Sequence, residues 1–118
     1  MRMVIAAILA MTTSLAFADE TDDAHRLAVS GRDAYWNCLA REYPRDGNKT
    51  MSEQEFTSLV ASVCASERQY FRVSLVDFLG LQFPAEDAGA HMTTANRAIE
   101  LAQKDIVTAF VRHRAAAK

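Results

Sequence analysis

Apolar residues recur at three- and four-residue steps through three long segments, and this spacing constrains the fold more than any other feature of the chain. The spacing places apolar side chains on one face of an α-helix, and no segment shows the two-residue alternation of a strand. The chain has only 4 glycines and 2 prolines, too few for the turns of a β-sandwich or barrel. The sequence therefore predicts an all-α fold.

The first predicted helix covers residues 22–43. Pro44 should end it, because proline lacks an N–H and disfavours helical geometry in the residue before it. The apolar stripe of this helix consists of small and aromatic residues: Ala24, Leu27, Ala28, Gly31, Tyr35, Cys38 and Leu39.

The second predicted helix starts at a capping box, in which the Ser52 hydroxyl accepts a hydrogen bond from the Glu55 N–H. Its apolar stripe continues from Phe56 to Leu79 and stops at Gly80. The pattern therefore predicts one unbroken helix of about 27 residues, or roughly 40 Å.

The third predicted helix begins at Pro84 or Ala85, with Thr93 or Thr94 as the alternative start because Gly89 weakens the first turn. Three amphipathic helices with short connections favour a small antiparallel three-helix bundle. The buried seam of the third helix is expected to comprise Met92, Ala95, Ile99, Ala102, Ile106, Ala109 and His113.

Residues 1–18 have the pattern of a signal peptide. Arg2 gives a positive start, residues 3–11 are apolar, and Ala16-Phe17-Ala18 matches a signal-peptidase site. A membrane anchor would need about 20 apolar residues, and polar residues interrupt the run at positions 12–14. We therefore expect cleavage after Ala18, no stable membrane anchor, and a single helical domain at residues 19–118 that is periplasmic or secreted.

Export determines how the two cysteines are interpreted. In an oxidising compartment, Cys38 and Cys64 should form a disulfide, whereas two free, reactive thiols are the alternative. Their spacing matches neither a Cys-x-x-Cys redox motif nor a zinc or haem-attachment pattern. A bridge would close a loop of about 27 residues and stabilise the fold by roughly 3.5 kcal/mol in the chain-entropy model.

Motifs for catalysis, cofactors and nucleic acids are not recognisable. The chain has no phosphate-binding glycine loop, nucleophile elbow or zinc-protease helix, and its formal net charge of −2 does not favour nucleic-acid binding. His25, His91 and His113 are scattered and are expected to be exposed, so we predict no metal and no cofactor. A non-enzymatic role follows as the working hypothesis.

Glu67 is the one charged residue on the apolar stripe of the second predicted helix, three residues after Cys64. A buried carboxylate needs a partner or must give up its charge. It is therefore a candidate buried charge with a functional interpretation, a tuned acid or ligand, and a structural one. In the structural one it forms an ion pair with Arg97 or Arg41, or lies at the rim of the core with its charge reaching solvent.

Residues 70–83 contain more apolar side chains than one helix face can bury, because nine of the 14 are apolar. Either the start of the third helix covers them, or they form an exposed patch for a partner or a second copy of the chain. The candidate interaction patch comprises Tyr70, Val73, Val76, Leu79 and Phe83.

With its signal peptide, Cys38 and the segment 60–67 (VASVCASE), the chain resembles small exported helical proteins of unknown function from Gram-negative bacteria. The resemblance implies a periplasmic, all-helical, disulfide-bonded protein and carries over no catalytic residue. The expected function is therefore a protein-interaction or accessory module, with a carrier of a small apolar ligand as the alternative.

Overall fold

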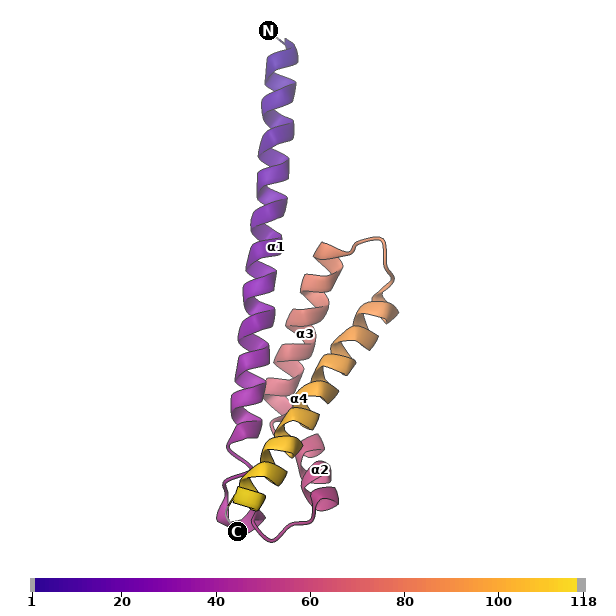
Figure 1. Ribbon diagram of the computed structural model, residues 1–118. Coiled ribbons are helices and arrows are strands. Elements are labelled where there is room, and N and C mark those ends of the chain that lie inside the picture. Colours follow the sequence, from indigo (N-terminus) through magenta and orange to yellow (C-terminus); the bar gives the residue numbers. More distant parts are fainter. Residues whose placement is uncertain (1, 117–118) are drawn as a thin grey trace.

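The computed structural model describes the backbone of residues 2–116 and the side chains of residues 18–116 (Figure 1). It contains four α-helices and one short 3-10 helix, and the described residues form no strand. The all-α prediction is therefore confirmed. The predicted signal peptide lies outside the residues with described side chains, except for Ala18. The elements are α1 (Arg2–Ala40), the 3-10 helix (Asp46–Asn48), α2 (Glu53–Ser62), α3 (Ala65–Gln82) and α4 (Ala88–Ala116).

The three long helices run in alternating directions, with α3 between α1 and α4 (Figure 1). The short helix α2 packs on the C-terminal half of α4, near the end of α1. Among the residues with described side chains, no helix is both long and apolar enough to cross a membrane. The expected antiparallel arrangement is thus observed for the long helices, but the bundle has four helices instead of three.

The prediction of one unbroken helix from residue 52 to residue 80 is wrong, because the chain breaks between α2 and α3. Val63 is extended and Cys64 is left-handed, with a φ of 59°. The break lets α2 place Phe56 and Val60 on α4 while α3 packs along α1, which one straight helix could not do. The apolar spacing continues across the break, so periodicity alone does not reveal it.

Other predicted helix ends are also shifted: α1 begins at Arg2 instead of residue 22, and α3 continues past Gly80 to Gln82. The first helix ends at Ala40, and residues 41–44 form turns before Pro44 can act as the terminator. The last helix begins at Ala88 instead of at Pro84, Ala85 or a threonine cap. The Asp87 carboxylate accepts a hydrogen bond from the Ala90 N–H at 2.7 Å, which satisfies a free donor of the first turn. The Ser52 cap of α2 is confirmed, because its hydroxyl accepts from the Glu55 N–H at 3.1 Å.

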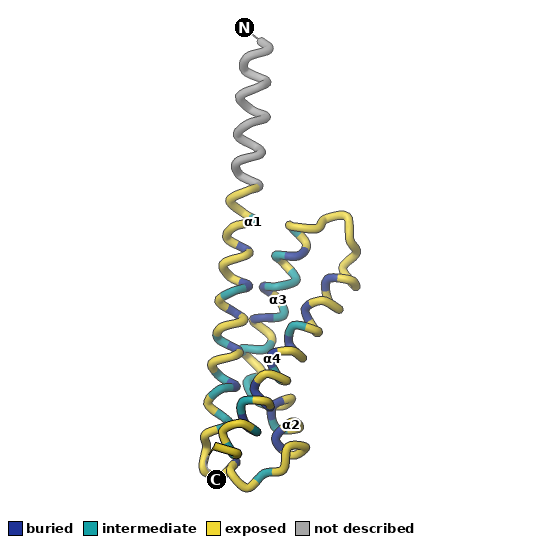
Figure 2. Tube along the Cα trace, viewed as in Figure 1, coloured by how far each residue is buried: buried dark blue, intermediate teal, exposed yellow. Residues whose placement is uncertain are grey.

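The hydrophobic core lies toward the disulfide end of the molecule, where all four helices meet (Figure 2). The Phe56 and Phe110 rings stack with their centroids 3.9 Å apart, which joins α2 to α4. Tyr35 is fully buried, and its hydroxyl accepts a hydrogen bond from the Gln103 amide at 2.9 Å. The other buried members of the core are Leu39, Val60, Phe71, Ile99, Ala102, Ile106 and Val107.

The buried stripe of α4 differs from the predicted seam at its two ends. Near the C-terminus, Val107 and Phe110 are buried, whereas Ala109 is half-buried and His113 is exposed. Met92 is exposed and His91 is buried in its place, because α4 begins early enough to put residue 91 in register with Ala95 and Ile99. The expectation that all three histidines are exposed is therefore wrong for His91. Its Nδ1 lies 3.7 Å from the Glu86 carboxylate and has no hydrogen-bond partner among the described residues.

Beyond the core, α1 and α3 approach each other through small residues. Ala24, Ala28 and Gly31 are the buried residues of α1 here, and the buried Ser74 lies opposite on α3. A Cβ atom on Gly31 would lie 2.9 Å from the Phe71 Cα and 2.8 Å from the Ser74 Oγ. The backbones of α1 and α3 are thus in close contact at Gly31.

Candidate functional site

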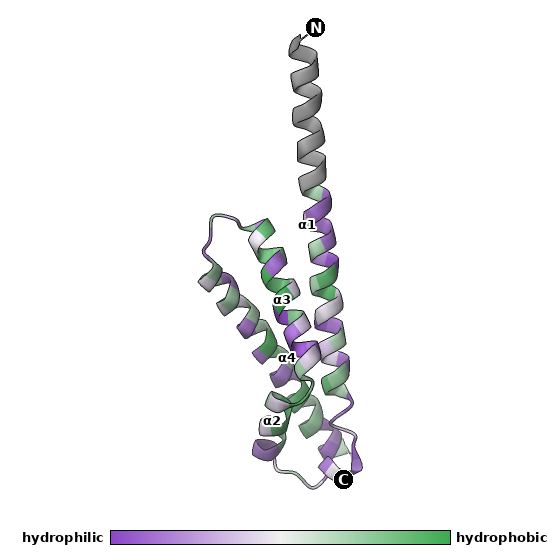
Figure 3. Cartoon of the chain, turned by 180° about the vertical axis from the view of Figure 1, so that it is seen from behind, coloured by the Kyte–Doolittle hydropathy of each residue, from purple (hydrophilic) through white to green (hydrophobic). Residues whose placement is uncertain are grey.

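A groove of about 690 Å³ runs between residues 20–27 of α1 and residues 70–81 of α3. Apolar residues of both helices make most of its walls, and Figure 3 shows the hydrophobic character of α3 at the end away from the disulfide. Leu27 and Val73 line it from the two sides and are 53% and 49% exposed. The other uncharged lining residues are Ala24, Tyr70, Ser74, Val76, Gly80 and Leu81.

The charged residues of the groove are all acidic. Glu20 and Asp23 lie on α1 and Asp77 on α3. Asp23 pairs with the exposed guanidinium of Arg26 at 3.0 Å, whereas Glu20 and Asp77 form no ion pair with any residue in the described part of the chain. Two carboxylates therefore remain available beside an apolar surface.

The predicted interaction patch only partly coincides with this groove. Tyr70 and Val73 are exposed and line it, and Val76 is half-buried and also lines it. Leu79 is buried against the rest of the molecule, so it offers no free surface. Phe83 is exposed but lies just after α3, outside the groove. The start of α4 does not cover Val73 or Phe83, which remain 49% and 47% exposed.

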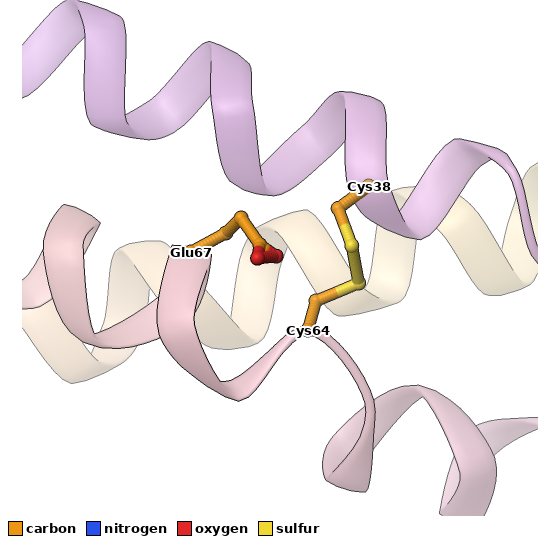
Figure 4. Close-up of side chains that lie close together, drawn as sticks. All are labelled: Cys38, Cys64 and Glu67. Atoms are coloured by element: carbon orange, nitrogen blue, oxygen red, sulfur yellow. A yellow bond between two sulfur atoms is a disulfide. The ribbon is translucent and has the colours of Figure 1, made fainter.

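The predicted cysteine pair is brought together at the opposite end of α3. Cys38 of α1 and Cys64 are joined, with an S–S distance of 2.07 Å and a Cα–Cα distance of 6.1 Å. Glu67 points toward the sulfur atoms from the first turn of α3 (Figure 4). It is half-buried, and the ion pair expected with Arg97 or Arg41 is not formed in the described structure.

The α1 side of the groove was not foreseen from the sequence. Leu27 fits the predicted stripe of α1, and the sequence gives no sign that it would face a groove instead of the core. Glu20 and Asp23 belong to an acidic segment, Asp19-Glu20-Thr21-Asp22-Asp23. The high negative charge of this segment is a feature of the sequence that could have pointed to the α1 side of the groove. Combining that segment with the apolar surplus of residues 70–83 required knowing that α1 and α3 are neighbours.

Comparisons of the chain with protein-family models, with curated proteins and with solved structures found no match in any of the three. The resemblance to small exported Gram-negative proteins stays a prediction.

Proposed function

We propose that this chain is an exported, non-enzymatic interaction module, periplasmic or secreted, that binds a basic amphipathic helix of another protein in the groove between α1 and α3. The single observation that supports this most strongly is that apolar residues of both helices and three carboxylates line the same groove. A third helix can pack along two antiparallel helices, with its side chains in the groove between them.

The charges of the groove specify the partner. Glu20 and Asp77 lack cationic partners among the described residues, so they favour lysine or arginine beside the apolar anchors of the incoming helix. Burial of one aliphatic side chain contributes about 1.5–3 kcal/mol. A few leucines on the partner, together with the basic residues around them, would give a specific complex.

The groove can be tested with two peptides of about 18 residues, or five helical turns. Both carry leucine on one face, and the other face is lysine in one peptide and glutamate in the second. Fluorescence anisotropy should detect binding of the lysine peptide, weakened by salt, and much weaker binding of the glutamate peptide. Val73→Arg should weaken the binding of the lysine peptide by about tenfold or more, because it removes an apolar contact worth at least about 1.4 kcal/mol.

The matched control is Leu101→Arg, because Leu101 is 60% exposed on α4 outside the groove and should tolerate the change. Equal weakening by both arginine variants, or equal binding of both peptides, contradicts the proposal.

A photo-reactive residue at position 73 in the native host should crosslink to a basic amphipathic segment. Crosslinks between two copies of this chain, or an apolar small molecule retained in native mass spectra and lost in Val73→Arg, would instead indicate a homodimer interface or a ligand carrier.

A further inference from the structure

A second site lies at the disulfide, where three side chains that can bind a metal converge. The two sulfur atoms and a Glu67 carboxylate oxygen all lie within 4.8 Å of one another (Figure 4). All three residues are half-buried. They come from the last turns of α1, the junction of α2 with α3, and the first turn of α3.

The backbone holds these groups in place. Cys64 is the residue immediately before α3, and its left-handed φ of 59°, together with the extended Val63, separates α3 from α2. Glu67 lies three residues later, so its side chain can reach back over the start of the helix. Arg68 stabilises the break, because its guanidinium donates a hydrogen bond to the Ala61 carbonyl at 2.7 Å. The convergence of Cys64 with Glu67 is thus local, and the disulfide adds Cys38 from a separate helix.

We propose that, once the disulfide is reduced, Cys38, Cys64 and Glu67 bind a thiophilic divalent cation, for which Zn²⁺ is the best fit. Zinc takes cysteine sulfur at about 2.3 Å and carboxylate oxygen at about 2.0–2.2 Å in tetrahedral geometry. Two thiolates on one such ion lie about 3.8 Å apart. The sulfurs can separate that far by side-chain rotation, because the two Cα atoms are already 6.1 Å apart. Water completes the fourth position.

The reaction balances with a dithiol as the reductant. A thiolate of the dithiol attacks one sulfur of the bridge, which breaks the Cys38–Cys64 bond and leaves a mixed disulfide. The second sulfur of the dithiol then attacks this mixed disulfide, so that the reductant leaves as a disulfide and both cysteines become thiols. Two electrons and two protons are thereby transferred to the cysteines. Metal binding then displaces both protons, because only thiolates bind zinc. The ion with two thiolates and one carboxylate carries a net charge of −1, which the N-terminal end of α3 stabilises.

The bridge and the metal are therefore mutually exclusive states of one site. The oxidised protein is closed by the disulfide, and the reduced protein closes the same contact between α1 and α3 through the ion. This role explains why Glu67 lies against the sulfur atoms without an ion-pair partner in the described structure.

Cobalt titration of the full chain tests the proposal. The protein is reduced with dithiothreitol, freed of the reductant without oxygen, and titrated with Co²⁺. A thiolate-to-cobalt charge-transfer band that saturates at one ion per chain and disappears on addition of Zn²⁺ is expected, and the oxidised protein should show none. Loss of a supporting group alone weakens metal binding about 10–100-fold, so Glu67→Gln should weaken Co²⁺ binding by at least about tenfold.

Glu100→Gln is the control, because Glu100 is exposed on α4 and should leave Co²⁺ affinity unchanged. Glu67→Gln retains both cysteines, so circular dichroism of its oxidised form checks that it folds. Absence of the charge-transfer band in the reduced protein overturns the proposal. Equal Co²⁺ affinity of Glu67→Gln and the unsubstituted protein also overturns it. An unfolded reduced chain whose thiols bind the ion without a formed site would give this same result and would overturn the proposal as well.

Discussion

Gly31 sets the distance between α1 and α3. A Cβ atom there would be 2.9 Å from the Phe71 Cα, and a backbone atom cannot yield without moving the whole helix. We expect Gly31→Ala to lower the free energy of unfolding by about 1–3 kcal/mol, as overpacking of a close contact does. Urea unfolding followed by circular dichroism measures the change.

Gly80 provides the matched control for Gly31. It lies in α3, and no atom would come within 4 Å of an added Cβ. Gly80→Ala should therefore raise the free energy of unfolding by about 0.5–1 kcal/mol, because alanine favours the helix. Changes of the same sign at the two positions would contradict the close approach at Gly31.

The break between α2 and α3 is the element that most changes the expected fold. The break can be tested through Cys64, whose backbone is left-handed. This conformation costs an L-residue about 1–2 kcal/mol and costs glycine very little. In a Cys38→Ala background, which removes the bridge, Cys64→Gly should be more stable than Cys64→Ala by about 1 kcal/mol. Thermal and urea unfolding of the two double variants give the difference.

The sign of that difference identifies the conformation of the segment. In one unbroken helix, glycine would be less stable than alanine by about 0.8–1.0 kcal/mol. A more stable Cys64→Ala variant would therefore support the continuous helix and contradict the observed break. The two variants share the same lost disulfide, so its contribution cancels from the comparison.

At the scale of the whole molecule, the core and the groove occupy different parts of the bundle. The aromatic core joins all four helices near the disulfide, whereas only α1 and α3 form the groove. Residues that support folding and residues proposed to bind the partner are therefore largely separate. The groove can vary with little effect on the core.

The proposed export makes a prediction about the whole chain. Protein recovered from the periplasm of its native host should begin at Asp19, as measured by intact mass. Its two cysteines should resist alkylation until a reductant is added, because an oxidising compartment preserves the bridge. Full-length protein in the cytosol, with both thiols open to alkylation, would contradict export and the oxidised state together.

Much of the local structure could be predicted from the sequence. From residue 22 onward, apolar spacing predicted the helical character of the long segments. The Ser52 cap was predicted correctly, and the cysteine count led to the Cys38–Cys64 pair. These features depend on residues close together in the chain or on redox chemistry. The number of apolar residues in the segment 70–83 also predicted an exposed surface, and Tyr70 and Val73 are exposed.

Sequence by itself thus determined that this protein is helical, which faces of its helices are apolar, and which sulfurs can pair. Only the tertiary structure decided that the middle helix breaks at Cys64, that His91 is buried in place of Met92, and that Leu27 faces a groove. The physical reason is that periodicity records which face of a helix is apolar but not what covers it. That depends on how closely α1 and α3 approach, on the direction of α2, and on where α4 begins.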